Sequence, residues 1–135
     1  MYKIFILGIL LTFYSISFSQ NIDTVYSNEV FLLLNNNKFN SIIIDGRDSV
    51  MFYSGHIENA KYINAFSETA NKQLEQYLES DTLFVYCTKQ RRSETIIDML
   101  INLDFKGKVI YMQDGINGWK KNDFPVEKMD WWKQN

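Results

Sequence analysis

The sequence is poor in the residues that cross-link small proteins. It contains one cysteine, Cys87, and one histidine, His56, so no disulfide can form within the chain and no cluster of cysteine and histidine ligands can hold zinc. It also has one proline and six glycines, and no Pro- or Gly-rich stretch divides it. We therefore expect a domain held together by its hydrophobic core, with no metal and no other cofactor.

Neither sign of charge is in excess. The 14 lysines and arginines nearly balance the 16 aspartates and glutamates, and the formal net charge is −2. So small a charge gives no reason to expect a nucleic-acid partner. Hydrophobic residues make up 46% of the 135 residues and aromatic residues 16%, which is typical of one packed globular domain.

A hydrophobic run long enough to span a bilayer is absent as well. The apolar stretch 4–14 is shorter than the roughly 20 residues that a spanning helix needs. Lys3 precedes it, and the segment 17–19 places serines at the −3 and −1 positions of a cleavage site. We predict a signal peptide over 1–19 and a single exported domain over 20–135, periplasmic or secreted, without stable membrane insertion after cleavage. An uncleaved N-terminal anchor is the alternative.

Short apolar runs alternate with helical patterns along the rest of the chain. The runs 41–45, 82–86 and 108–112 are rich in β-branched and aromatic residues, and they predict strands that are covered on both faces. Strands that alternate with helices predict an α/β fold around a central, mainly parallel sheet. The expected helices begin at a Ser27 cap, run from an Asp48 cap to Gly55, and cover 67–79 and 93–103.

Cys87 directly follows the predicted strand 82–86, at the sheet edge where the sites of α/β folds gather. Lys89, Arg91 and Arg92 come next, and a helix is expected from Ser93. Cationic side chains and the N–H groups of a helix N-terminus favour the thiolate and bind anions. The pattern therefore predicts a nucleophilic cysteine for an anionic substrate. The alternative is a buried, inert cysteine beside a solvated basic turn.

Four stretches, in order, resemble motifs of the rhodanese domain family, and the resemblance runs from about residue 28 to residue 127. Each motif is weak by itself, but four in the right order at plausible spacing are strong. They are Asp45-Gly46-Arg47 at a strand end, Gly55-His56-Ile57-Glu58-Asn59-Ala60, Cys87 with Arg92-Ser93, and Asp114-Gly115-Ile116-Asn117-Gly118-Trp119 with Phe124-Pro125-Val126.

The resemblance implies a rhodanese-like α/β fold, with helices on both faces of the sheet, and a sulfurtransferase that works through a persulfide on Cys87. The donor would be a small anion such as thiosulfate, or a persulfide on a partner protein, and the acceptor a thiol or cyanide. Arg92 and the backbone N–H groups of 88–92 would stabilise the thiolate and the persulfide, with the thiol open to solvent. The protein is expected to be a monomer. Thr88, Lys89, Gln90 and Arg91 would bind the substrate.

Three residues near the predicted site are interpreted as structural. Asp45 and Arg47 form a pair of opposite charges at a strand terminus, and His56 belongs to a framework motif in the family. Gly115, Gly118 and Trp119 are interpreted as turn and packing residues, and Trp131 and Trp132 as a tail that packs on the domain.

The chain departs from the family at two positions. Gln90 stands where many members have glycine, so strain in the loop is expected, and Asp114 replaces the first glycine of a pair. Two other functions stay open: a phosphatase of the related Cys-loop kind and a weakly catalytic binding or redox-sensing module. The phosphatase is disfavoured because Cys87 and Arg92 bracket four residues, whereas the phosphatase loop has five.

Overall fold

The computed structural model describes residues 21–36 and 41–129 of the protein. The predicted signal peptide 1–19 and the tryptophans of the predicted tail, Trp131 and Trp132, lie outside the described residues. Within those two ranges, none of the helices combines the length and the apolar character that crossing a bilayer requires.

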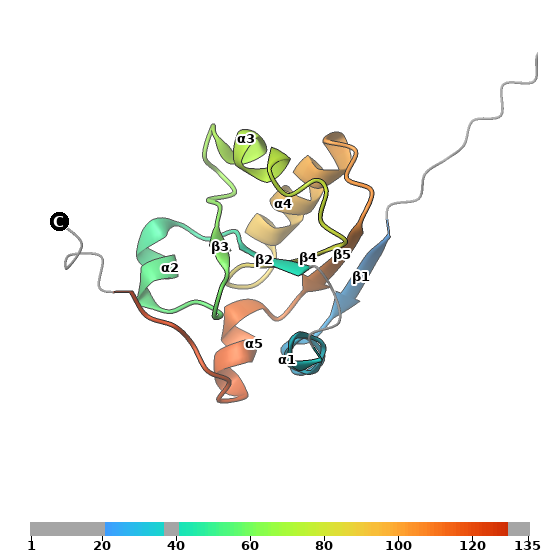
Figure 1. Ribbon diagram of the computed structural model, residues 1–135. Coiled ribbons are helices and arrows are strands. Elements are labelled where there is room, and N and C mark those ends of the chain that lie inside the picture. The colour runs from blue at the N-terminus through green and yellow to red at the C-terminus, as the bar shows by residue number, and fades with distance from the viewer. Residues whose placement is uncertain (1–20, 37–40, 130–135) are drawn as a thin grey trace, which may run out of the picture.

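One sheet of five parallel strands forms the centre of the fold, in the order β1-β5-β4-β2-β3 (Figure 1). The three predicted strands are confirmed, and β4, which is buried along its whole length, lies in the middle. Two strands were not predicted, because one is half exposed and the other has two residues. The strands are β1 (Ile22–Val25), β2 (Ser41–Asp45), β3 (Lys61–Tyr62), β4 (Thr82–Tyr86) and β5 (Lys108–Met112).

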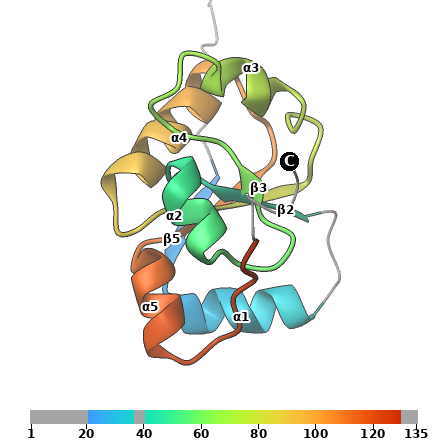
Figure 2. The same ribbon diagram turned by 90° about the vertical axis from the view of Figure 1, so that its left-hand side faces the viewer.

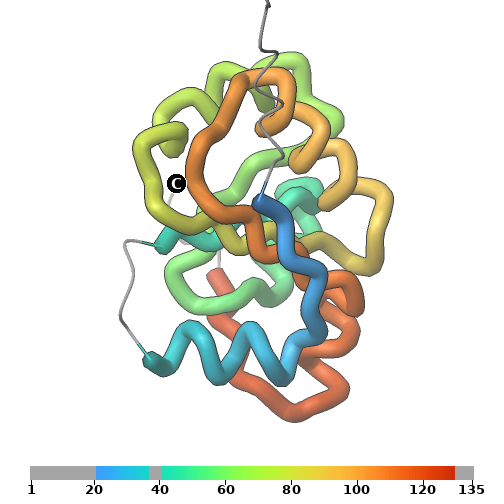
Figure 3. The backbone as a smooth tube through the Cα atoms, turned by 90° about the vertical axis from the view of Figure 1, so that its right-hand side faces the viewer, coloured from blue at the N-terminus to red at the C-terminus, as the bar shows by residue number. Residues whose placement is uncertain are grey.

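Helices cover both faces of the sheet, which confirms the predicted α/β class (Figure 2). α1 and α5 lie together on one face, where β1 leads directly into α1 (Figure 3), and α3 and α4 cover the other. α2 connects β2 to β3. The helices are α1 (Ser27–Asn35), α2 (Ser49–Ser54), α3 (Ala70–Glu75), α4 (Arg91–Asn102) and α5 (Gly115–Lys121).

Alternation along the central strands divides the core into two layers. Val85 and Tyr111 face α4, whereas their neighbours Phe84 and Ile110 face α1 and α5. Because helices cover both faces of the sheet, both sets of side chains are buried on folding. Each large apolar side chain that is buried stabilises the fold by about 1.5–3 kcal/mol. This double burial explains why the strands have continuous apolar sequences.

The helix termini agree only in part with the sequence. Asp48 caps α2, accepting a hydrogen bond from the Met51 amide at 3.0 Å, and Gly55 ends the helix with a φ of 153°, as expected. α3 is shorter than predicted at both ends, since it begins at Ala70, after Ser67 and Thr69 bond to each other, and ends at Glu75. α4 is longer, since it begins at Arg91.

Ser27 does not cap α1 as predicted, because it is the first helical residue and its side chain points to α5. The Ser27 amide and hydroxyl donate to the two Asp114 carboxylate oxygens, at 2.9 and 2.7 Å, and the hydroxyl accepts from Asn122 Nδ2 at 3.0 Å. Asp114, one of the two departures from the family pattern, thus ties the start of α1 to α5.

Gly115, Gly118 and Trp119, which were interpreted as turn and packing residues, all lie in the helix α5. The turn part of that interpretation is wrong for Gly118, whereas Trp119 packs in the core as expected. Gly118 is the residue that makes room for Asp114, since an ideal Cβ there would lie 1.8 Å from Asp114 Oδ2. The two glycines that suggest a turn in the sequence are therefore accommodated inside α5 and at its first position.

We predict that Ser27→Ala lowers the free energy of unfolding by about 1–3 kcal/mol, because it removes the hydrogen bonds of the buried hydroxyl to Asp114 and Asn122. Urea unfolding of the purified protein measures this loss. Ser54→Ala is the matched control, since its exposed hydroxyl bonds only to the Met51 carbonyl, and it should change the value by less than about 0.5 kcal/mol. Equal effects of the two substitutions would contradict the role given to Ser27.

Candidate active site

Cys87 lies at the carboxyl end of the central strand, where the chain leaves β4 for a short loop that leads into α4. The Ile116 amide donates to the Cys87 carbonyl at 2.8 Å, so the start of α5 fixes the backbone of the cysteine. Lys89 and Gln90 are exposed on the loop, and Thr88 is half-buried. The structure thus places Cys87 at the sheet edge that the sequence predicts for a site.

The expectation of a thiol open to solvent is wrong, because Cys87 is only 2% exposed. Polar groups lie around it as well as apolar ones. The hydroxyl oxygens of Ser93 and Tyr111 are buried, and neither has a hydrogen-bond partner among the described residues. The cysteine is therefore buried at the point where β4 passes into the loop.

The Arg92 guanidinium lies between two neighbouring segments. Its Nη2 is 3.5 Å from Asp48 Oδ2, and its Cζ is 5.5 Å from the centre of the Phe66 ring. Its Nε is buried and has no hydrogen-bond partner in the part of the chain that the structure describes. Asp48 thus holds Arg92 and caps α2 at the same time, which couples the Cys87 loop to the end of β2.

The loop rests on two side chains that the sequence motifs did not indicate. Thr88 Oγ1 donates to Met51 Sδ at 3.7 Å, and the Arg91 Cζ lies 5.3 Å from the centre of the Phe66 ring. Met51 belongs to the first turn of α2, so the predicted Asp48 cap would have located it. Phe66 carries no comparable signal in the sequence.

The Tyr111 hydroxyl interacts electrostatically with the cysteine. Burial, together with the smaller effects of the charges of Glu94 and Cys87, raises the pKa of its hydroxyl to about 12. Since each of these effects disfavours the phenolate, Tyr111 stays neutral and presents an O–H group near the loop.

The predicted Asp45–Arg47 pair is buried beside the loop. Arg47 Nε donates to both carboxylate oxygens of Asp45, at 2.9 and 3.1 Å, and Nη2 donates to Asp45 Oδ2 at 2.6 Å and to the Gly55 carbonyl at 2.8 Å. Burial alone would lower the pKa of Arg47, but the hydrogen bond and charge of Asp45 outweigh it and the pKa is raised. The pair joins the end of β2 to the end of α2.

Tyr86, the last residue of β4, belongs to the same buried network. Its hydroxyl accepts a hydrogen bond from the Ile57 amide at 3.0 Å. Burial raises its pKa, and the nearby Asp45 carboxylate raises it further. The residue that precedes Cys87 is thereby anchored to the segment that follows α2.

His56 lies on the α2 side of this network and not among the residues that cover Cys87. Its Nδ1 is 2.9 Å from the Phe52 carbonyl, so this nitrogen carries the proton, and its ring stacks on Phe52 with centroids 3.8 Å apart. Nε2 lies 3.6 Å from Glu127 Oε2. These contacts fit a framework residue, and the structural roles of Asp45, Arg47 and His56 stay predictions.

Gln90 does not strain the loop in the way that its replacement of a glycine suggested. Its φ is −129°, outside the left-handed region that favours glycine. The glycine on which the loop depends is Gly115, with a φ of 59°, since an ideal Cβ there would lie 2.4 Å from the Thr88 carbonyl oxygen and 2.5 Å from that of Cys87.

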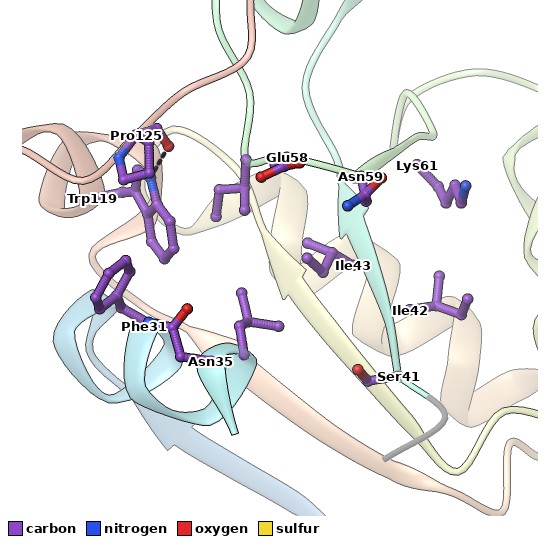
Figure 4. A pocket seen from close by; sticks show the side chains of 12 residues that line it. Phe31, Asn35, Ser41, Ile42, Ile43, Glu58, Asn59, Lys61, Trp119 and Pro125 are labelled. Carbon is purple, nitrogen blue, oxygen red and sulfur yellow. Dashed lines mark hydrogen bonds between the residues drawn. The ribbon is translucent and has the colours of Figure 1, made fainter. Parts of the chain in front are cut away.

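A pocket of about 410 Å³ opens elsewhere, between α1, the start of β2 and the segment after α5 (Figure 4). Phe31 and Trp119 form its apolar side, where Trp119 Nε1 donates to the Pro125 carbonyl at 2.8 Å, and Glu58 and Lys61 lie on its polar side. None of the residues of the Cys87 loop lines it. Within 21–36 and 41–129, no three His, Cys, Asp or Glu residues are grouped closely enough to hold a metal ion.

We predict that Gly115→Ala displaces the Cys87 loop, because the new methyl group has no room and the backbone would be strained by about 1–3 kcal/mol. Alkylation of Cys87 by iodoacetamide should become at least about tenfold faster as the loop opens. Gly46→Ala is the control next to the same loop, since its Cβ would make an ordinary contact of 3.4 Å with Ile96. If Gly115→Ala had the same alkylation rate and the same stability as the wild-type protein, the role given to this glycine would be refuted.

We also predict an alkaline loss of stability that depends on Tyr111. A tyrosine with a raised pKa stabilises the fold below its ordinary pKa of 10, and this stabilisation disappears as the pH rises through 10 towards 12. Urea unfolding between about pH 8 and pH 11 should show the decline. Tyr111→Phe should make it shallower, while Tyr26→Phe, at an exposed position, should not. A decline of unchanged steepness in Tyr111→Phe would contradict the prediction.

Comparison with known proteins agrees with the four motifs. The model of the Rhodanese-like domain family matches residues 28–122. A tRNA uridine(34) hydroxylase from Buchnera aphidicola is 34% identical over 110 residues, which cover 76% of this chain and 33% of that protein. The chain therefore spans about a third of the length of the curated relatives that it matches.

Solved structures share the fold at low sequence identity. The rhodanese-like domain of an Anabaena protein superposes with a TM-score of 0.68 at 20% identity, over 82% of this chain and 81% of that one. A thiosulfate sulfurtransferase from Pseudomonas aeruginosa gives a TM-score of 0.64 at 22% identity, over 79% of this chain and 20% of that one. With the family match over most of its length and the same architecture, this chain belongs to the rhodanese-like domain family.

Proposed function

We propose that the protein is a sulfurtransferase that carries sulfane sulfur as a persulfide on Cys87. The observation that supports this most is the position of the only cysteine, at the end of the central strand under a loop that enters α4 at Arg91 and Arg92. Family membership supports an enzyme of this general type. The donor is proposed to be a small anion such as thiosulfate, and the acceptor a thiol or cyanide.

The proposed reaction has two displacement steps. The Cys87 thiolate attacks the outer sulfur of thiosulfate, the S–S bond of the donor breaks, and sulfite leaves with the electron pair. A nucleophilic acceptor then attacks the outer sulfur of the persulfide, and Cys87 leaves as the thiolate. One sulfur atom moves in each cycle, and no external oxidant or reductant is consumed.

The residues around Cys87 take separate parts in this proposal. Arg92 and the N–H groups of 88–92 stabilise negative charge at the thiolate and the persulfide, because fixed donors act strongly where water is excluded. Lys89 and Arg91, which are exposed on and next to the loop, attract the anionic sulfur donor. Thr88 and Gln90 contribute the remaining contacts of the binding site.

Buried polar atoms of Arg92 and Ser93, which follow Cys87 in the chain, and of Tyr111 support a ligand in the loop. Arg92 Nε, Ser93 Oγ and the Tyr111 hydroxyl lack partners among the described residues, and leaving such groups unpaired is costly. A persulfide or a bound anion would provide an acceptor for them. The burial of Cys87 fits the same chemistry, because a single transferred sulfur needs little room and a covered persulfide is protected from oxidation.

Two other functions receive less support. A phosphate monoester is bulkier, and four residues separate Cys87 from Arg92 where the phosphatase loop has five. The name of the Buchnera relative raises a tRNA substrate, but the net charge of −2 gives no reason to expect one. We further propose that the protein acts outside the cytoplasm, and this proposal rests on the signal-like segment 1–19 alone. We also propose that it acts as a monomer.

Mass spectrometry of the intact protein after incubation with thiosulfate tests the proposal. We expect a gain of one sulfur, about 32 Da, that a thiol removes and that is absent in Cys87→Ser. Arg92→Ala should load sulfur at least about 100-fold more slowly, whereas Lys72→Ala, which removes an exposed cation from α3, should load normally.

Other outcomes identify the alternatives. A wild-type protein that gains no sulfur from thiosulfate or from a persulfide donor would be a binding or redox-sensing module. Hydrolysis of a phosphate ester by the wild type but not by Cys87→Ser would make the protein a phosphatase.

A further inference from the structure

The pocket between α1 and the start of β2 lies where the sheet is left open by a short strand. β3 pairs with β2 only at Ile44 and Asp45, so within 21–36 and 41–129 no strand covers the outer edge of 41–43. Side chains of α1 and of the segment 57–59 line this part of the sheet instead, and a space of about 410 Å³ remains (Figure 4). Since small-molecule sites have volumes of about 300–1,000 Å³, the pocket has room for one small ligand.

One side of the pocket is an apolar wall that the core holds in place. Trp119 is 3% exposed, and its indole nitrogen donates to the Pro125 carbonyl. The centroid of the Phe31 ring lies 5.7 Å from that of Trp119, in an edge-to-face contact, and 4.1 Å from that of Phe124, on which it stacks. The apolar surface is therefore formed before any ligand binds, as in most small-molecule sites.

The other side of the pocket carries polar side chains that have no partner among the described residues. There are five of them, and none forms a hydrogen bond or an ion pair with another described residue: Asn35, Ser41, Glu58, Asn59 and Lys61. Glu58 and Lys61 are the two charged residues of this set, one of each sign, and they do not pair with each other. A ligand with a single charge would be attracted by one of them and repelled by the other, whereas a zwitterion complements both.

We propose that this pocket binds a free apolar α-amino acid. The ammonium group of the ligand pairs with the Glu58 carboxylate, and its carboxylate pairs with the Lys61 ammonium group. The side chain of the ligand packs on Phe31 and Trp119, which removes its apolar surface from water. None of the residues of the Cys87 loop lines the pocket, so this inference does not rest on the proposed sulfur transfer.

NMR titrations of the nitrogen-15-labelled protein with four probes test the proposal. The probes are L-leucine, isocaproate, which lacks the ammonium group, isoamylamine, which lacks the carboxylate, and L-serine, which lacks the apolar side chain. We expect L-leucine to shift the amide signals of Phe31 and Lys61 and the indole N–H signal of Trp119. Its Kd should be at least about tenfold lower than that of each other probe, because each of them lacks one charged or apolar contact.

Two substitutions test the two charges separately. Glu58→Gln should raise the Kd of L-leucine at least about fivefold and should not weaken the binding of isocaproate, which has no ammonium group to lose a partner. Lys61→Gln should raise the Kd of L-leucine by a similar factor and should not weaken the binding of isoamylamine. Glu75→Gln is the matched control, since Glu75 is exposed at the end of α3 on the other face of the sheet, and it should leave the binding of L-leucine unchanged.

Selective binding of L-leucine that both substitutions weaken would support the site. The proposal is overturned if none of these signals shifts up to the solubility limit of L-leucine, if the four probes bind equally, or if L-leucine binds both variants as it binds the wild-type protein. Because these titrations do not measure the loading of Cys87, the proposed sulfur transfer stands or fails independently of them.

Discussion

The hydrogen bond from the Ile116 amide to the Cys87 carbonyl is the contact on which the geometry of the site depends. This hydrogen bond forms because Gly115 adopts a φ of 59° and has no side chain. A residue with a Cβ at position 115 would keep the start of α5 further from the loop that follows β4. On the opposite side, the Gly46 amide donates to the Tyr86 carbonyl at 2.9 Å. The backbone around the cysteine is therefore held from both neighbouring strands.

This clamping has consequences for the surface above the cysteine. A loop fixed at its base places Thr88, Arg91 and Arg92 at defined positions, where they contact Met51, Phe66 and Asp48. The buried Asp45–Arg47 pair fixes the segment that carries Asp48, because Arg47 also bonds to the end of α2. Framework and reactive residues thus form one connected structure, in which Cys87 is buried and Lys89 and Arg91 are exposed.

Much of the fold could be predicted from the sequence, and the failures have physical causes. The strands 41–45, 82–86 and 108–112 were predicted correctly because burial on both faces leaves continuous apolar runs. β1 gives no such signal, since its two middle residues are exposed. Gly115 and Gly118 were interpreted as turn residues, but both lie in α5, where Gly115 makes room for the Cys87 loop and Gly118 makes room for Asp114.

The candidate site was predicted less completely. The four motifs place Cys87, Arg92 and the Asp45–Arg47 pair at one edge of the sheet, as the structure shows. The burial of Cys87 was only the alternative in the sequence, and the contacts of Phe66 with Arg91 and Arg92 could not be predicted, because they join segments that are distant in the sequence.

A crystal structure of the protein soaked with thiosulfate tests the central claim most directly. The account predicts one additional sulfur atom on Cys87 Sγ, inside the loop and within about 3.5–4 Å of the N–H groups of 88–92. An unmodified thiol, or oxygen atoms on Sγ in place of sulfur, would contradict a persulfide carrier at this position.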